Sequence, residues 1–466
     1  MNEIDSSESL HLKRQIGIYA ATAITIGSII GSGIFRSPHS VAHQISSVPL
    51  TIFAWILGGV LSLTGSLVLA ELAVTHPRTG GLYVFIREGF GDRFGFVFGW
   101  ASLWVIKPTV IASITSVFAT YFCEALGWPK GAELPAGVAA IAVLTYINWL
   151  GVREGARTQS LLSTLKVAGI LGLCAAAFAL PHAGPAASAA SAAGAAGVAG
   201  VAGAAGAPVA AASSHPLAVA LAVAMISILF AYDGWTDSTY VGGELRNPKR
   251  DFPFAILGGT VIVVALYVLT NLAYFHVLTP GEVATNEAVA SEAMRRVLGE
   301  WGSRAIAVLV AVSTFGCISS SVLTGPRVTL AMAADGLFWK RAAHVNERRG
   351  TPDVALWLQG VLSVVWLGCA RGFEDVSGWF VTTSWVFYGF TIAAVFVQRR
   401  REREGKLAAP PYRSPLHPWT AVLFILVTAA IIASDLSASG WRAAAGLIVA
   451  ALGFPVYSLM QRRRRT

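Results

Sequence analysis

Long apolar runs separated by short polar stretches form the dominant pattern of this sequence. A helix that crosses a bilayer needs about 20 apolar residues, and a scan for such runs predicts about twelve of them. The predicted spans are residues 16–38, 48–72, 94–123, 136–150, 158–180, 216–241, 254–278, 303–330, 353–370, 376–397, 417–435 and 440–460. The pattern therefore predicts an all-α protein that crosses a membrane many times.

The composition agrees with this prediction. Of the 466 residues, 55% are apolar and 13% are charged, whereas a soluble domain carries about 25% charged residues. The formal net charge of +9 resides in short basic clusters between apolar runs, so it indicates membrane topology and no nucleic-acid partner. No removable signal peptide is expected, and the lipid bilayer is the predicted surrounding.

A low-complexity stretch at residues 183–214 is also apolar and long enough to span a bilayer. The distribution of basic residues argues against a crossing there, because cytoplasmic loops carry an excess of Lys and Arg. With twelve helices and a cytoplasmic N-terminus, the runs "QRRREREGK" and "QRRRRT" both face the cytoplasm. An extra crossing at 183–214 would turn both outward, so this stretch is predicted to be an extracytoplasmic loop.

The helices divide into two predicted repeats with added elements. The predicted segments are a cytoplasmic N-terminal tail (1–15), a first repeat (16–180), an extracytoplasmic Ala/Gly-rich loop (181–215), a second repeat (216–397), a basic cytoplasmic loop (398–416), two further helices (417–460) and a basic cytoplasmic tail (461–466). Both termini are expected in the cytoplasm, and the protein is expected in the inner membrane of the cell.

Two of the predicted helices carry breaks at matching places. "ITIGSIIGSGIF" in the first and "MISILFAYDGW" in the sixth are apolar segments that end in Gly-containing interruptions at mid-span. Five helices separate them, so the two copies cross in opposite directions. Inverted repeats with broken helices indicate the midplane binding site of a secondary transporter, here a LeuT-type arrangement of five plus five helices. Close helix packing at small residues is the alternative interpretation.

Helix polarity predicts what the breaks can bind. Unpaired carbonyls are expected near Ile30 and Phe230, and unpaired N–H groups near Gly33 and Gly234. Helix ends with free N–H groups favour anions, and ends with free carbonyls favour cations. A zwitterion satisfies both, which makes a free amino acid the predicted ligand.

The motifs of this chain resemble those of a known transporter family. They are "GSGIF" (31–35), "HPRTGGLYVFIREGFG" (76–91), "FAYDGW" with "GELRNPKRDFPFAI" (243–256), "STFG" (313–316), Arg327 with "AADGLFWK" (333–340), and "WVFYGFTIAAVFVQRR" (385–400). In this order and spacing the sequence resembles the amino acid–polyamine–organocation superfamily, specifically its L-type amino acid transporter branch. The resemblance extends from about residue 14 to 420.

The resemblance implies a substrate site at the two breaks. It assigns the substrate carboxylate to Ile30, Gly31, Ser32 and Gly33, and the amino group to Phe230, Ala231 and the backbone around Asp233 and Gly234. It also implies that Phe230 is an aromatic gate and that Trp235 lines the side-chain pocket. Eukaryotic light chains of the branch carry a cysteine after the third helix for a heavy-subunit disulfide. The loop "EALGWPKGAELP" has none, so an obligate heavy subunit is not expected.

Charged residues inside the predicted spans require a partner or a function, since each costs about 2.5–3.5 kcal/mol at membrane depth. Lys166 lies where the family places a lysine against the first break, which implies bonds to carbonyls of the first helix and to the eighth helix, and sodium independence. A proton-coupling role and a lysine that snorkels to the cytoplasmic surface are the alternatives. Asp233 is interpreted either as the partner of a cationic substrate side chain or as a structural residue, which caps the N–H groups of the following half-helix or pairs with Lys107. Lys107, before Pro108, is the other candidate for the specificity pocket, although a structural kink is the favoured interpretation.

Four further charged residues are expected to contact water. Asp237 is expected to face water, with a pocket role as the alternative. Glu71, Glu244 and Arg327 are interpreted as solvated charges at helix ends, with an inner gate as the alternative.

Other function classes lack their motifs. The sequence has no GxxxxGK[ST] loop for ATP, no HExxH or GxSxG, and no metal-ligand spacing among its nine histidines. No enzyme activity, cofactor or metal is therefore predicted. The predicted function is alternating-access, sodium-independent exchange of amino acids. Proton symport or uniport of neutral or cationic amino acids or polyamines is the alternative, and an amino-acid-sensing receptor without transport is the rival of another class.

Overall fold

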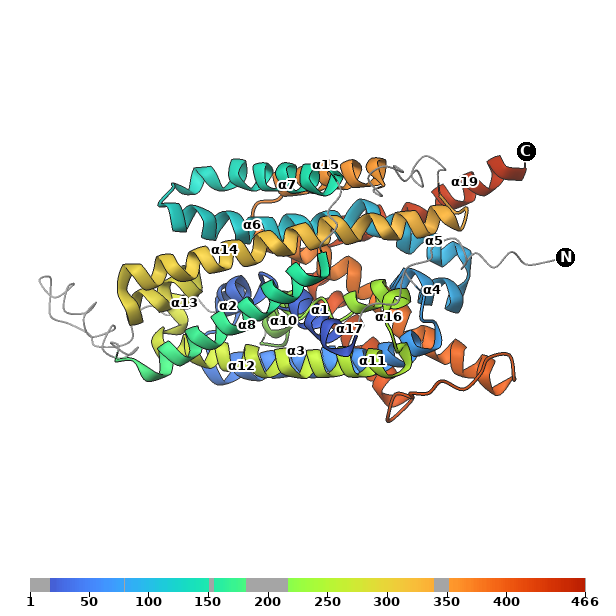
Figure 1. The fold of residues 1–466 in the computed structure, drawn as a ribbon, viewed down its shortest axis with the longest axis horizontal. Coiled ribbons are helices and arrows are strands. Elements are labelled where there is room, and N and C mark those ends of the chain that lie inside the picture. The colour runs from blue at the N-terminus through green and yellow to red at the C-terminus, as the bar shows by residue number, and fades with distance from the viewer. Residues whose placement is uncertain (1–16, 79, 151–154, 182–216, 339–351, 466) are drawn as a thin grey trace, which may run out of the picture.

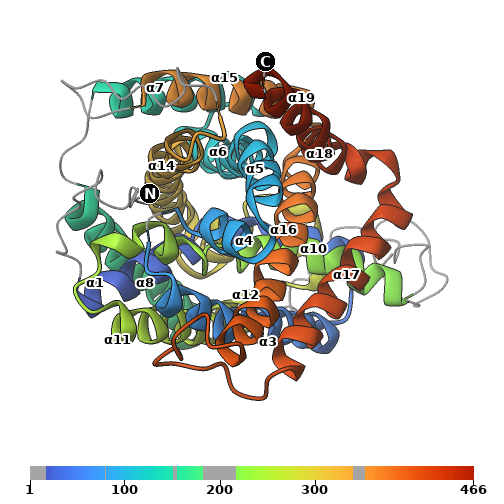
Figure 2. The same cartoon turned by 90° about the vertical axis from the view of Figure 1, so that its right-hand side faces the viewer.

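The computed structural model describes residues 17–78, 80–150, 155–181, 217–338 and 352–465. These ranges contain helices and no β-strand. Most helices run roughly along the long axis of the molecule (Figure 1), and the end-on view shows them as a bundle around α6, α14 and α16 (Figure 2). The all-α fold class of a polytopic membrane protein is thereby confirmed, while the full five-plus-five arrangement stays a prediction.

The bounds of the elements are as follows. The α-helices are α1 (Ile18–Ile29), α2 (Gly33–Gln44), α3 (Val48–Thr75), α4 (Leu82–Phe90), α5 (Asp92–Ala101), α6 (Lys107–Leu126), α7 (Glu133–Leu150), α8 (Gly155–Ala179), α10 (Leu217–Ala231), α11 (Pro248–Pro253), α12 (Gly259–Val277), α13 (Pro280–Thr285), α14 (Val289–Ala334), α15 (Asp353–Cys369), α16 (Phe373–Arg403), α17 (Trp419–Ser439), α18 (Trp441–Ala451) and α19 (Gly453–Arg465). Short π-helical or 3₁₀-helical segments are η1 (Ser102–Ile106), η2 (Lys130–Ala132), η3 (Asp237–Glu244) and η4 (Phe254–Gly258).

The apolar helices agree with the predicted spans. Within the described ranges, nine helical segments are long and apolar enough to cross a bilayer, and the shorter apolar helices are Ser163–Ala179, Leu217–Ala231 and Asp353–Cys369. Each of the predicted spans overlaps one of these segments. The predicted loop at 183–214 lies outside the described residues, as do the predicted tail 1–15 and part of the second repeat.

Both predicted breaks are present, and the broken helices pack side by side. The first crossing is split into α1 and α2, and the sixth into α10 and η3. The first half, α1, packs against η3, while α2 packs against α10. Each half therefore contacts the opposite half of its partner, which makes the two broken helices antiparallel, as the inverted-repeat hypothesis requires.

A proline explains the irregular turn before α6. Pro108 has no N–H to donate to the carbonyl of residue 104 in the preceding turn, and the chain widens there into the π-helical segment η1. The indole Nε1 of Trp366 in α15 donates to the freed Trp104 carbonyl at 2.8 Å. The kink expected beside Lys107 is thus present, and it is stabilised by a neighbouring helix.

Different helices lie at the two ends of the bundle. α13 and the start of α14 lie at the left-hand end in Figure 1, here called the α13 end. α4, α5 and α19 lie towards the right-hand end, here called the α4 end. The chain crosses from the α4 end to the α13 end through α1 and α2, and it returns through α10 and η3.

Candidate functional site

The first break is a short turn between two helical halves. The last hydrogen bond of α1 runs from the Ile30 N–H to the Ile26 carbonyl at 2.8 Å, and Ile30 then leaves helical geometry with ψ of 77°. The next helical residue is Gly33, at the start of α2. Residues 30–33 are all buried, so this backbone is not solvated in the conformation described.

Two other helices bind the carbonyls at the end of α1. The Tyr267 hydroxyl of α12 donates to the Ile29 carbonyl at 2.8 Å. The Lys166 Nζ of α8 donates to the Gly27 carbonyl at 3.2 Å, and it lies 2.8 Å from the Cys317 Sγ of α14. Lys166 is buried, and its contacts are those that the sequence analysis expected with the first and eighth crossings. Its role in ion coupling stays a prediction.

The second break contacts the first without intervening side chains. Gly234 has a φ of +109°, a region that favours glycine, and a β-carbon there would lie 2.6 Å from the Ser28 carbonyl carbon. A β-carbon on Gly33 would lie 2.3 Å from the Ala231 Cα. We call these two contacts the glycine interlock. Because both positions are glycine, the backbones of the two breaks lie closer together than a β-carbon at either position would permit.

A cavity of about 60 Å³ lies beside the interlock on its α4 side. A water molecule needs about 10–15 Å³ of such volume, so the cavity holds a few waters or a small polar group. Its walls come from α1, α4, α5, η1, α6, η3, α14 and α16, together with the break before η3. The lining residues are Ser28, Leu82, Phe98, Ile106, Lys107, Val110, Ile114, Asp233, Gly234, Thr236, Asp237, Tyr240, Ser321, Phe380 and Tyr388.

The cavity carries charges of both signs. The Asp233 Oδ1 accepts a hydrogen bond of 2.5 Å from the Tyr388 hydroxyl of α16. The Lys107 Nζ stands over the Tyr240 ring, 4.9 Å from its centroid. Asp237 is half-buried and also lines the cavity, which favours the pocket alternative of its sequence interpretation. Asp233 and Lys107 form no ion pair with each other in this structure. Asp233 contacts Tyr388 and Lys107 contacts Tyr240 instead.

The predicted site residues divide into two groups. Asp233, Gly234 and Lys107 line the cavity. The residues predicted to bind the substrate's main-chain groups are packed beside it instead of lining it, and these are Ile30, Gly31, Ser32, Gly33, Phe230 and Ala231. Tyr240, Tyr388 and Ser28 were missed. Ser28 and Tyr388 lie within stretches that the sequence analysis singled out, and Tyr240 follows "FAYDGW" by five residues.

Trp235 is not part of the cavity wall. Its ring packs edge-on against Tyr388 at 5.4 Å and against Phe424 of α17 at 6.0 Å, both measured between ring centroids. The prediction that Trp235 lines the side-chain pocket does not fit this arrangement, because the backbone turn at Gly234 directs the indole towards α17.

Phe230 links the cavity to the α13 end. Its ring lies edge-on to Phe380, a cavity residue, at 5.9 Å, and edge-on to Phe373 at 5.1 Å. The Arg36 guanidinium stands 5.6 Å from the centroid of the Phe373 ring. Aromatic rings and a cation therefore stack between the cavity and the α13 end.

Arg36 is the centre of an ion cluster that sequence analysis missed. This buried arginine of α2 contacts Glu287, before α14, at 3.1 Å and Glu374, at the start of α16, at 3.2 Å. Ser40 donates to Glu374 at 2.9 Å, and Lys130 contacts Glu287 at 3.4 Å. We call these five residues the Arg36 cluster. It joins elements far apart in the sequence across the α13 end.

Electrostatics keep Glu287 ionised in this cluster. Burial raises the pKa of Glu287, but the charges of Arg36 and Lys130 outweigh burial and hold that pKa below its ordinary value. The carboxylate therefore remains a partner for Arg36 at neutral pH.

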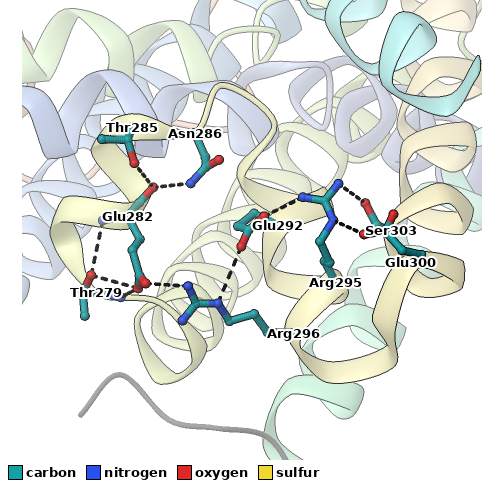
Figure 3. A network of polar contacts seen from close by, with 9 residues as sticks. All are labelled: Thr279, Glu282, Thr285, Asn286, Glu292, Arg295, Arg296, Glu300 and Ser303. Atoms are coloured by element: carbon teal, nitrogen blue, oxygen red, sulfur yellow. Dashed lines mark hydrogen bonds and ion pairs between the residues drawn. The ribbon is translucent and has the colours of Figure 1, made fainter. Parts of the chain in front are cut away.

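A second network fixes the segment that carries Glu287 (Figure 3). Thr279 and Glu282 form a capping box at the start of α13, and Arg296 of α14 reaches Glu282 at 2.5 Å. Arg295 contacts Glu292 at 2.6 Å, and it binds Glu124 at the end of α6 at 2.6 Å. These contacts hold α13 and the start of α14 against α6, so that Glu287 lies within reach of Arg36.

Ion pairs also close the α4 end. The Tyr83 hydroxyl of α4 donates to Asp335 at 2.7 Å, and Arg87 contacts the same carboxylate at 2.9 Å. Glu71 of α3 is fully buried and accepts two hydrogen bonds from Arg399, at 2.8 and 2.7 Å. The interpretation of Glu71 as a solvated charge was wrong, because Arg399 and the Ser414 N–H, at 2.7 Å, replace water. The Glu244 side chain lies outside the described residues.

Comparisons with known proteins agree with this architecture. A family model described as amino acid permease matches residues 16–454. The serine/threonine exchanger SteT of Bacillus subtilis is 31% identical over 461 residues, which cover 98% of this chain and 99% of the relative. The human b(0,+)-type amino acid transporter 1 is 31% identical and the mouse Asc-type amino acid transporter 1 is 29% identical, over 89% and 97% of this chain and 82% of each relative.

Proposed function

This chain belongs to the amino acid permease family, and on that premise we propose that it exchanges amino acids across the membrane by alternating access, without sodium. It is a multi-pass membrane transporter of amino acids and no enzyme. Exchange, rather than net uptake, has its support in the similarity to a serine/threonine exchanger over nearly the whole of both chains.

The observation that carries the proposal is the pair of antiparallel helix breaks beside a charged cavity. A broken helix inside a bilayer requires other partners for its backbone groups, and Tyr267 and Lys166 supply two of them here. In the described state, the Arg36 cluster and the Phe230–Phe373 pair lie between the breaks and the α13 end. The contacts of Tyr83 and Arg87 with Asp335 lie at the α4 end. Opening one of these two closures while the other stays shut would expose the cavity alternately to each side.

The α4 end is the cytoplasmic end in this proposal. Basic residues gather there, among them the exposed Arg246, Lys249 and Arg250 before α12 and the arginines that end α16. An excess of Lys and Arg marks cytoplasmic loops. The protein then has its repeats at 16–180 and 216–397, both termini in the cytoplasm, and the inner membrane as its location.

The cavity supports a zwitterionic substrate with a neutral or cationic side chain. Main-chain groups of residues 30–33, 230 and 231 would bind the carboxylate and ammonium once the interlock loosens. Asp233 would then receive a cationic side chain, while Lys107 balances its charge when a neutral substrate is bound. Polyamines are the alternative, because they offer cations without a carboxylate.

Sodium independence follows in this proposal from Lys166. Its ammonium binds the Gly27 carbonyl and so supplies a fixed positive charge at the first break. A cation held at that carbonyl would be repelled at short range. No disulfide-linked heavy subunit is required, because the loop between α6 and α7 carries no cysteine.

Counterflow in proteoliposomes tests the exchange mechanism. Vesicles with purified protein are preloaded with unlabelled serine, alanine, leucine or arginine, and initial uptake of the same labelled amino acid is compared with that of empty-lumen vesicles. Exchange predicts uptake at least tenfold faster in preloaded vesicles, equal in sodium and choline media. The full panel of amino acids and common polyamines, run as competitors at two pH values, then defines the substrates.

Other outcomes identify the alternatives. Equal uptake with and without internal substrate would refute exchange and favour a uniporter, or a proton symporter if an inward proton gradient drives accumulation. Saturable binding without uptake under any gradient would favour a sensing receptor. Protein-free vesicles provide the baseline for leak.

A further inference from the structure

A second cavity lies at the α4 end, between α5 and α19. The two helices pack through an aromatic seam, with ring centroids 5.8 Å apart for Phe94–Phe454 and 5.3 Å apart for Phe96–Tyr457. Next to this seam the side chains leave an open cavity of about 330 Å³. Its lining residues are Arg93, Tyr457, Ser458, Gln461 and Arg462.

The cavity lies at the membrane surface. The apolar spans Asp92–Leu126 and Ala444–Arg462 run in opposite directions, and Arg93 is near the start of the first while Arg462 ends the second. Both guanidinium groups therefore lie at the same boundary between apolar chain and water, the depth of lipid headgroups. Figure 2 looks onto this end and shows α19 at the perimeter of the bundle, outside α5.

The charge of the cavity is positive and uncompensated. Within the described part of the chain, no carboxylate contacts Arg93 or Arg462, and none lines the cavity. The neighbouring Asp92 accepts a hydrogen bond from Arg87 at 2.8 Å instead. The Arg93 guanidinium stands 5.1 Å from the centroid of the Phe454 ring, a cation–π contact that orients the group without neutralising it.

The remaining lining groups suit a phosphodiester. Guanidinium groups bind phosphate oxygens with two parallel hydrogen bonds. Tyr457 supplies a hydroxyl group and Gln461 an amide beside the two arginines, while the Ser458 hydroxyl donates to the Phe454 carbonyl at 3.1 Å. Basic pockets between membrane helices are a recurrent way to bind lipid headgroups.

We propose that this cavity is a binding site for the headgroup of an anionic phospholipid. Arg93 and Arg462 bind the phosphate from two helices, and the lipid thereby fastens α19 to the start of α5. The site is separate from the amino acid cavity, so it stands or falls independently of the exchange mechanism.

Native mass spectrometry of delipidated protein in neutral detergent tests the site. Phosphatidylglycerol is titrated into wild type, into R93Q/R462Q, and into R246Q/R250Q. The last variant removes the same charge from two exposed arginines of the α4 end outside the cavity. Wild type and R246Q/R250Q should bind the first lipid with equal affinity, and R93Q/R462Q should bind it at least tenfold more weakly. R93K/R462K should recover part of the loss.

Controls separate the headgroup from general charge effects. Phosphatidylcholine should bind wild type at least tenfold more weakly than phosphatidylglycerol, and the thermal midpoint of the variants in phosphatidylcholine alone reports on their folding. Equal phosphatidylglycerol affinity in all variants would overturn the proposal. So would displacement of the lipid by an equal concentration of inorganic phosphate, which would indicate a free-anion site.

Discussion

The two glycines of "GSGIF" should respond very differently to the same substitution. A β-carbon on Gly33 would lie 2.3 Å from the Ala231 Cα and 2.7 Å from the Ala231 Cβ. A β-carbon on Gly31 would meet nothing closer than 4.0 Å. Gly33→Ala therefore forces α2 and α10 apart, whereas Gly31→Ala fits the described structure.

The size of the effect follows from the contact. Carbon atoms pack best at about 3.5–4.0 Å, so the helices must separate by about 1 Å or more. Overpacking of this kind costs about 1–3 kcal/mol, and the upper part of that range applies because the obstacle is backbone and not a flexible side chain. At about 1.4 kcal/mol for each factor of ten, the described arrangement loses roughly 100-fold in population. Alanine would otherwise favour a helix by up to about 1 kcal/mol, so helix propensity opposes this loss.

Initial exchange rate and thermal midpoint, both normalised to the amount of reconstituted protein, measure the effect. Gly33→Ala should lower the rate at least tenfold and reduce the thermal midpoint. Gly31→Ala should stay within about twofold of wild type, because its β-carbon meets no atom closer than 4.0 Å. Equal behaviour of the two variants, or a larger defect in Gly31→Ala, would refute the glycine interlock.

Three further substitutions test the charged groups. Lys166→Met should lower exchange in sodium-free medium more than Cys317→Ala does, because only the first removes the donor to the Gly27 carbonyl; equal losses in parallel uptake assays would contradict this. Asp233→Asn should reduce uptake of arginine and lysine at least tenfold and spare alanine and leucine, whereas an equal loss for all four would indicate a structural role. Arg36→Gln should accelerate hydrogen exchange in α13, with Arg304→Gln, an exposed arginine in α14, as the matched control; unchanged protection would argue against a closure role for the Arg36 cluster.

The spans and the breaks could be predicted because their signals are local. Each crossing needs an unbroken apolar run of fixed length, and each break needs small residues within a few positions. The prolines at 108 and 253 likewise act on the turn that surrounds them, where η1 and η4 form. Such features depend on neighbours in sequence, so a single chain contains enough information to locate them.

The polar contacts of the site could not be predicted because their partners are distant in sequence. Arg36 and Glu374 are 338 positions apart, and Asp233 and Tyr388 are 155 apart. Either carboxylate, taken alone, has several possible partners within its own repeat. Glu71 shows the same difficulty, since its burial depends on Arg399 and on the Ser414 N–H from a loop after α16.

The direction in which a side chain points at a helix break could not be predicted from the sequence either. Trp235 follows Asp233 by two residues, and a helix or a strand would give each a defined face. The φ of +109° at Gly234 belongs to neither, so neither periodicity predicts that Asp233 accepts from the Tyr388 hydroxyl while the Trp235 ring packs against Tyr388 and Phe424. Backbone conformations outside the regular regions erase the periodicity on which sequence interpretation depends.

The glycine interlock also distinguishes positions of this transporter that tolerate substitution from positions that do not. Its contacts are backbone against backbone, so no change of side chain can adjust them by small steps, and every replacement at Gly33 or Gly234 removes the contact outright. Around it, Lys107, Asp233 and Ser321 line the cavity. Redesign of substrate preference should therefore begin at these three positions, where a change of charge or size leaves the moving parts intact.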